Sequence, residues 1–286
     1  MRILTSLVFL FCASASFSQL EHPKVSPAAM VTQEVGFTKI TIAYSRPAVR
    51  GRKIFGDLVP YERIWRVGAN ESTKITFDTA VQIRNSTLAS GTYALYAFPK
   101  EDEWQIVFHT NTTHWGDGRK NYDPKEDALR VIVKPLKTDT FQENFLIAFD
   151  SLTHSTADLI LHWANTKVVI PIAVDTHEIM ERQIEEKLSQ QANAQTYYEA
   201  ARYYVEQDMK FDTALAYLNK AIELGGDTYY FHRIKSLVEA KLEDYAAALK
   251  SAKKSLQLAQ EQDKDEFVRM NQKNIDIWNE KLKMKN

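Results

Sequence analysis

The hydrophobic pattern of this 286-residue chain changes its period near Thr176. Before that point apolar and polar residues alternate, as in TKITIAY at residues 38–44. After it apolar residues recur every four positions, as Met180, Ile184 and Leu188 do. A period of two is typical of a strand with one buried face, and a period near 3.6 is typical of an amphipathic helix. We therefore expect two folded domains, a β-domain over residues 19–175 and an all-α domain over residues 176–286.

Short segments rich in β-branched and aromatic residues, separated by turn signals, favour an antiparallel β-sandwich for the first domain. No long helical pattern interrupts them, which argues against a parallel α/β sheet. The polar stretch PKEDE at residues 99–103 predicts a hairpin turn. The expected strands are residues 38–44, 73–77, 91–98, 104–108, 129–133, 144–149, 158–163 and 167–174.

The second domain contains an internal repeat. Residues 214–224 align with residues 248–258 at an offset of 34 residues, which is the tetratricopeptide period. Small residues within both segments would let paired helices approach closely; they are Ala214, Ala221, Ala248 and Ser255. The segment resembles the tetratricopeptide repeat family, although Lys235 stands where that family has an apolar residue and the terminal proline is missing. We expect two divergent repeats, supported by a helix over 177–190 and closed by one over 263–283.

The N-terminus has the three parts of a secretory signal peptide. Arg2 precedes an apolar run at residues 3–11, and small residues follow up to Ser18. Residues 1–18 are therefore expected to be removed, which predicts an exported protein, periplasmic or secreted to the cell surface, with no membrane span after cleavage. The only cysteine, Cys12, lies within this peptide, and Phe11 before it disfavours lipid attachment. The mature chain would have no disulfide and no thiol nucleophile.

The formal net charge is -1. A nucleic-acid-binding protein needs a basic face to displace counterions, and docking on anionic lipid needs a similar cluster. Neither class of partner is expected.

Several motifs occur in a fixed order in the first domain: SRP at 45–47, GRKIFG at 51–56, LVPY at 58–61, WRVGANE at 65–71 and GTYAL at 91–95. On these motifs, residues 25–174 resemble the domain of unknown function 2911 family, an exported domain met mainly in Bacteroidetes-type bacteria. The resemblance implies a periplasmic or surface-exposed β-domain, sometimes followed by helical repeats. It brings no established reaction and no catalytic residues.

A long connection, residues 45–70, combines arginines with aromatic residues and suggests a ligand site. Arginine binds carboxylates and phosphates through two parallel hydrogen bonds, and Trp and Tyr stack on sugars. The candidate ligand-binding residues are Arg46, Arg52, Tyr61, Trp65, Arg66, Asn70, Glu71 and Trp115. The alternative is that these side chains pin the loop to the sandwich as a lid.

A metal centre is considered at His109, His114, Asp117 and Asp123, but their spacing matches no standard metal motif, so no metal or cofactor is predicted. His162 lies between Leu161 and Trp163 and is expected to face solvent. No nucleophile elbow, Walker loop or dinucleotide fingerprint is present.

Five side chains of the helical repeats are candidates for binding a protein partner in a concave groove: Tyr198, Arg202, Asn219, His232 and Lys235. The alternative is a spacer or a dimer interface. The expected function is binding of a small polar ligand or envelope glycan by the β-domain and of a protein by the repeats. The runner-up is a hydrolase of glycans or esters that uses Glu71 or a His/Asp site.

Overall fold

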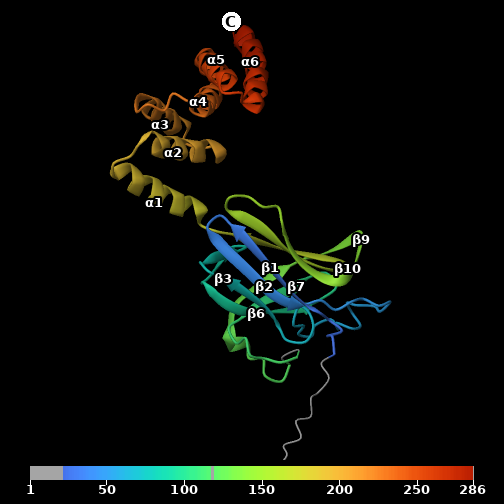
Figure 1. Ribbon diagram of the computed structural model, residues 1–286. Coiled ribbons are helices and arrows are strands. Elements are labelled where there is room, and N and C mark those ends of the chain that lie inside the picture. Colours follow the sequence, from blue (N-terminus) through green and yellow to red (C-terminus); the bar gives the residue numbers. More distant parts are fainter. Residues whose placement is uncertain (1–21, 117–118, 286) are drawn as a thin grey trace, which may run out of the picture. The chain divides into compact units, whose positions relative to one another are not determined.

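The computed structural model describes residues 22–116 and 119–285, and its contacts divide them into two compact units that meet at Thr176 and His177 (Figure 1). The first unit consists of antiparallel sheets and the second of helices. The expected fold class, an antiparallel β-sandwich followed by an all-α array, is therefore confirmed. The predicted signal peptide and Asp117 lie outside the described residues.

Two antiparallel sheets form the sandwich. The larger sheet has the order β1-β2-β3-β6-β7-β8 and the smaller the order β5-β4-β10-β9. The bounds in the larger sheet are β1 Ala28–Val35, β2 Thr38–Ser45, β3 Thr73–Phe77, β6 Gly91–Pro99, β7 Trp104–His109 and β8 Asp127–Val133. Those in the smaller sheet are β4 Val81–Ile83, β5 Ser86–Leu88, β9 Pro135–Asp150 and β10 Thr156–Ala173, and a short 3₁₀ helix, η1 Pro124–Glu126, precedes β8.

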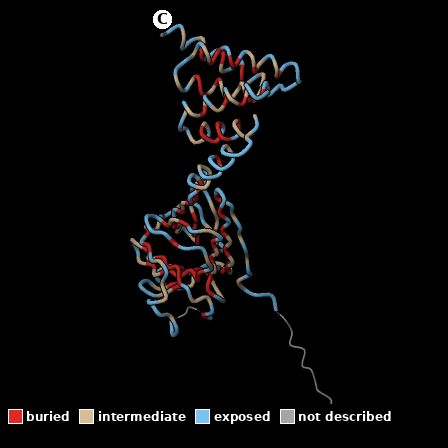
Figure 2. Tube along the Cα trace, turned by 90° about the vertical axis from the view of Figure 1, so that its left-hand side faces the viewer, coloured by how far each residue is buried: buried red, intermediate tan, exposed pale blue. Residues whose placement is uncertain are grey.

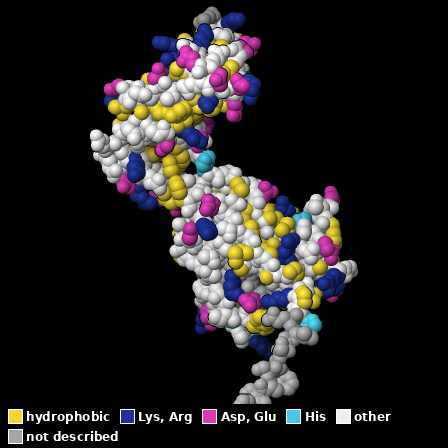
Figure 3. Space-filling model, viewed as in Figure 1, with side chains coloured by type: hydrophobic (Ala, Val, Ile, Leu, Met, Phe, Trp, Pro, Cys, Tyr) yellow, Lys and Arg dark blue, Asp and Glu magenta, His cyan; other side chains and the backbone are white. Residues whose placement is uncertain are grey.

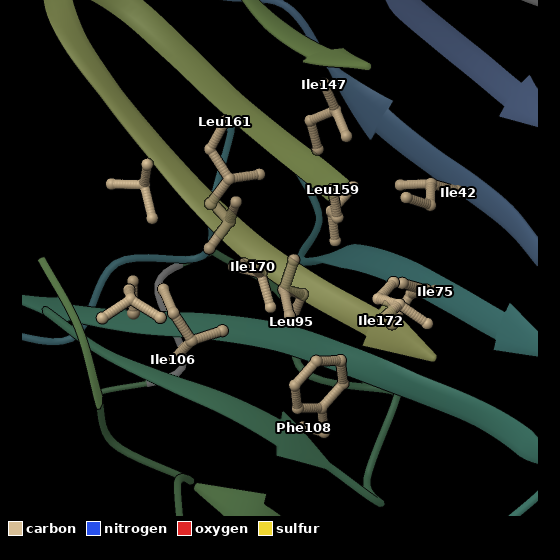
Figure 4. Close-up of a cluster of buried hydrophobic side chains, with 14 of the residues drawn as sticks. Ile42, Ile75, Leu95, Ile106, Phe108, Ile147, Leu159, Leu161, Ile170 and Ile172 are labelled. Carbon is tan, nitrogen blue, oxygen red and sulfur yellow. The ribbon is translucent and has the colours of Figure 1, made fainter. Parts of the chain in front are cut away.

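The core lies between the two sheets. Figure 4 shows side chains of both facing one another: Ile42, Ile75, Leu95, Ile106 and Phe108 from the larger sheet, and Ile147, Leu159, Leu161, Ile170 and Ile172 from the smaller. All are almost fully buried. The alternation in the sequence produces this arrangement, because every second side chain of a strand points to the same face. Removing this apolar area from water is the main stabilisation of a domain that contains no cysteine.

The hairpin expected around residues 99–103 is confirmed, since Pro99 pairs with Trp104 across β6 and β7. The separate strands expected at 158–163 and 167–174 are instead one strand, β10, whose register shifts on either side of Ala164. The expectation for His162 is wrong: it is only 8% exposed, and its Nε2 lies 3.2 Å from the carbonyl oxygen of Thr140. A bulge next to His162 and the long partner strand β9 cover a face that simple alternation assigns to solvent.

The long connection between β2 and β3 closes one end of the sandwich. Trp65 exchanges two backbone hydrogen bonds of 2.8 Å with Ala97, along the part of β6 that β3 does not reach. Earlier in the loop, the amide of Val49 donates to the carbonyl of Glu143 on β9 of the smaller sheet. The loop therefore joins both sheets, and its apolar residues Ile54 and Trp65 belong to the core.

The second unit contains the helices α1 Thr176–Ser189, α2 Ala194–Glu206, α3 Phe211–Glu223, α4 Tyr229–Lys241, α5 Tyr245–Glu261 and α6 Asp265–Lys285. Consecutive helices from α2 to α6 pack against one another, and α2 also contacts α4 as α4 contacts α6. The small residues Ala214, Ala221, Ala248 and Ser255 are completely buried between helices, as expected. Figure 2 shows buried residues along the facing sides of the stacked helices. The helices are thus arranged as a repeating array.

A membrane-spanning helix needs about twenty mostly apolar residues. Within residues 22–116 and 119–285, no helix combines that length with enough apolar character.

Candidate functional site

Three arginines surround a hollow on the loop that closes the sandwich. The hollow has a volume of about 260 Å³, and Arg50, Arg52 and Arg66 line it together with backbone around Gly68. None of the described residues that line it has a carboxylate. Arg52 and Arg66 were predicted for a ligand site, and the structure brings them together with Arg50.

The guanidinium of Arg52 binds backbone oxygens of the loop. Its Nε donates to the carbonyl of Val49 at 3.0 Å and its Nη2 to that of Ala48 at 2.6 Å. Neither Arg50 nor Arg52 forms an ion pair with a carboxylate in the described parts of the chain. The carboxylate of Glu143 accepts the backbone N–H of Arg50 at 2.9 Å, and Glu143 does not line the hollow. Carbonyl partners fix the guanidinium without cancelling its charge.

The backbone beside Arg66 is strained. Val67 has a φ of 51°, in the left-handed region that β-branched residues rarely adopt. It is completely buried, and its carbonyl accepts a hydrogen bond from the hydroxyl of Thr73. Such a conformation costs about 1–3 kcal/mol and persists only where its surroundings enforce it. The loop is therefore held in one shape around the hollow.

Of the three aromatic residues predicted for the ligand site, Trp65 lines the arginine hollow and Tyr61 and Trp115 do not. Trp65 is 5% exposed and its ring packs among Phe55, Trp104 and Trp163, so it contributes little open surface to the hollow. Tyr61 covers Gly56, and a Cβ added there would lie 2.8 Å from the Tyr61 ring. Trp115 is 71% exposed and lies away from the arginine hollow.

Asn70 and Glu71 line a second hollow, of about 400 Å³, over the outer face of β1, β2 and β3. The amide of Asn70 donates to the carbonyl of Ser26 and to the hydroxyl of Ser45, both at 3.1 Å. Glu71 Oε2 lies 2.8 Å from Lys74 Nζ. The hydrogen bond and charge of Lys74 lower the pKa of Glu71, opposite to the raised pKa that a glycosidase acid needs.

Arg46 has a supporting role. Its Nε donates to the carbonyl of Phe145 at 3.0 Å, which ties the end of β2 to β9. It lines neither hollow. The contact fits the alternative reading, in which part of the arginine set holds the loop on the sandwich.

A group of interacting polar side chains lies on the outer face of the larger sheet. We call His109, His114, Glu126 and Asp127 the histidine cluster. His109 is completely buried; its Nδ1 lies 3.0 Å from Asp127 Oδ1 and its Nε2 lies 3.2 Å from Glu126 Oε2. Despite the second contact, Nε2 has no hydrogen-bond partner among the described residues. Nδ1 of His114 lies 3.3 Å from the hydroxyl of Tyr96.

Further side chains hold this cluster in place. Tyr122 donates its hydroxyl hydrogen to Asp127, at 2.7 Å from Oδ2, and Arg130 binds the same oxygen at 2.7 Å. Burial, followed by the negative charge and hydrogen bond of Asp127, raises the pKa of Tyr122 well above its usual range. Asp127 therefore joins an aromatic ring, a guanidinium and His109 in one network.

Sequence reasoning missed Glu126 and Asp127, and proposed Asp117 and Asp123 beside the two histidines. The Asp123 side chain instead accepts a hydrogen bond from the amide of Lys125 and caps the N-terminus of η1. The missed signal was strand pairing, because His109 at the end of β7 lies opposite Asp127 at the start of β8.

Four of the five residues predicted to bind a partner lie on α2 and α4, which contact one another. Tyr198 stacks on Phe231 with ring centroids 4.4 Å apart. Arg202 pairs with Glu206 at 2.6 Å and remains 54% exposed. His232 and Lys235 lie on α4, next to Asp227 and Glu239 respectively. The fifth residue, Asn219, is exposed on α3.

Comparison with known proteins gives one relationship. Residues 26–172 match the model of the family described as "Protein of unknown function (DUF2911)". Searches of the curated proteins and of the solved structures found no match. The matched segment includes the arginine hollow and the histidine cluster and ends just before the helical array. The chain belongs to the DUF2911 family.

Proposed function

We propose that this protein is an exported, non-catalytic binding protein whose β-domain takes a small anionic ligand in the arginine hollow. The observation that carries the proposal is three arginines around one hollow that no described carboxylate lines. Arginine recognises carboxylates and phosphates through paired, charge-assisted hydrogen bonds. An anionic sugar of the bacterial envelope, such as a uronic acid, fits both this charge and the expectation of a polar ligand.

The hollow is also preorganised. Arg52 is fixed by two carbonyl oxygens, and Val67 holds the backbone in a conformation that it would not adopt alone. Ordering the loop before binding lowers the entropy lost when the ligand enters. We expect a rigid arginine site to select ligands by their charge and shape rather than by the surface area that they bury.

We assign the helical array to the tetratricopeptide type and to a protein partner. Its support is the 34-residue recurrence together with the contacts of α2 with α4 and of α4 with α6. Figure 3 shows apolar side chains at the surface of the array, the kind of surface that protein partners cover. Export rests on the signal-peptide pattern of residues 1–18 and is tested by N-terminal sequencing of the mature protein.

Isothermal titration of the tag-free mature protein with glucuronate and with glucose tests the anion site. We expect binding of glucuronate only, because the two sugars differ in the carboxylate. Arg50→Gln removes an exposed guanidinium from the hollow and should weaken binding by about 10-fold or more, the value of a charge-assisted hydrogen bond.

Arg63→Gln is the matched control, because Arg63 is an exposed arginine of the same loop that does not line the hollow. It should bind glucuronate like the unmodified protein. An equal loss of glucuronate affinity in the Arg50 and Arg63 variants would mean that only the net charge of the protein matters, and not the hollow. Equal binding of glucose and glucuronate would refute an anion site.

A further inference from the structure

We propose that His109, His114 and Glu126 bind one divalent transition-metal ion on the outer face of the larger sheet, with Zn²⁺ as the natural probe. One ligand atom from each of these side chains lies within 4.8 Å of the other two. Two imidazoles and one carboxylate form a ligand set that suits zinc and neighbouring metals. The site is independent of the arginine hollow and of the ligand proposed there.

The separation of two of the ligand atoms fits a shared metal ion. Zinc bonds of about 2.0–2.2 Å in tetrahedral geometry place ligand atoms roughly 3.4 Å apart. His109 Nε2 and Glu126 Oε2 are 3.2 Å apart, close to that separation. Nε2 of His109 forms no hydrogen bond with a described residue, so it is available to a metal ion.

Asp127 favours the tautomer of His109 that can bind a metal ion. Its Oδ1 lies 3.0 Å from Nδ1, which fixes the proton on Nδ1 and leaves a lone pair on Nε2. A carboxylate behind a ligating imidazole is the common outer-shell arrangement of zinc sites. Asp127 is in turn held by Tyr122 and Arg130.

The other two ligands are held as well. The hydroxyl of Tyr96 lies beside Nδ1 of His114, which is 7% exposed. The carbonyl of Glu126 accepts hydrogen bonds of 2.9 Å from both the amide and the hydroxyl of Thr110. The Glu126 side chain remains 40% exposed, which gives an ion a route in and leaves a coordination position for water.

A competing arrangement is a doubly protonated His109 between the carboxylates of Glu126 and Asp127. It would need a hydrogen bond from Nε2 of this completely buried ring, and Nε2 forms none with a described residue. A metal ion satisfies Nε2 and both neighbouring ligands together. The geometry therefore favours the metal.

The test uses the tag-free mature protein after dialysis against a chelator. Isothermal titration with Zn²⁺ should give one site per chain, with no comparable binding of Mg²⁺ or Ca²⁺, since those ions prefer oxygen ligands. Co²⁺ should produce visible absorption bands that Zn²⁺ removes. Glu126→Gln and Asp127→Asn should each weaken zinc binding by about 10-fold or more.

His154→Gln is the control, because His154 is an exposed histidine of the same domain outside the cluster. It should leave zinc binding unchanged. Circular dichroism checks that each variant is folded, and the partly exposed Glu126 side chain makes Glu126→Gln the variant least prone to misfold. Absence of a one-to-one zinc site, or equal affinity in the Glu126 and His154 variants, would overturn the proposal. So would nitrogen NMR that shows His109 protonated on both ring nitrogens in the presence of zinc.

Discussion

Glu239 on α4 is predicted to destabilise the helical array at neutral pH. Its side chain is 6% exposed, and its Oε2 has no hydrogen-bond partner among the described residues. Oε1 lies 3.7 Å from Lys235 Nζ, beyond a hydrogen bond. Burial raises the pKa of Glu239, and the Ser251 hydroxyl and Lys235 offset this only in part. The ionised carboxylate of Glu239 is therefore buried without full compensation by hydrogen bonds or opposite charge.

Glu239→Gln keeps the shape and removes the charge. We expect the variant to be more stable at pH 7–8 by about 1 kcal/mol, the scale of one poorly paired buried group. For an unfolding domain of roughly 100 residues, this stabilisation raises the melting temperature by about 4 °C. The helical circular-dichroism signal of the full chain measures it, because helices dominate that signal and the β-domain contributes little.

The pH dependence gives the sharper test. A carboxyl whose folded pKa lies above its unfolded pKa binds more protons in the folded state, so it favours folding at low pH. This contribution is complete below the unfolded pKa and is lost as pH rises through the folded one. The advantage of Glu239→Gln should therefore shrink towards zero near pH 4. Glu280→Gln, at an exposed position on α6, should show neither effect. A variant less stable than the unmodified protein at neutral pH would refute the reasoning.

Two further substitutions test packing. Ser255→Ala should destabilise the array by about 1–3 kcal/mol, because the completely buried amide of Asn271 donates to the Ser255 hydroxyl at 2.8 Å and would lose its acceptor; urea unfolding measures the loss. Gly36→Ala should cost the β-domain about 2 kcal/mol or more, because φ is 56° and a Cβ would lie 1.8 Å from Thr176 Oγ1. Gly51→Ala is its control, with φ of 70° and no atom within 4 Å, so a loss as large in thermal unfolding would contradict the steric argument.

Among the longer strands, those with one buried face were predictable and those without one were not, while the three-residue strands β4 and β5 were not predicted. The strand expected at residues 73–77 coincides with β3, which alternates strictly between buried and half-buried residues. By contrast β1 is an edge strand whose residues are half-buried or exposed along most of its length, so its sequence carries little alternation. The first half of β9 is likewise largely exposed and pairs with residues 164–168 in the middle of β10. In both cases the strand is specified by backbone pairing to a neighbour, which the residues of the segment alone do not encode.

The same limit explains what happened at the candidate sites. The arginines could be grouped from the sequence because Arg50, Arg52 and Arg66 all belong to one connection, residues 45–70, which the structure folds around one hollow. His109 and Glu126 are separated by a loop, and only the pairing of β7 with β8 places them side by side. Sequence spacing therefore identifies site residues that belong to one helix or one loop. It misses site residues that the pairing of two strands brings together. For an antiparallel domain, the residues opposite each strand-end histidine are the better place to look for its partners.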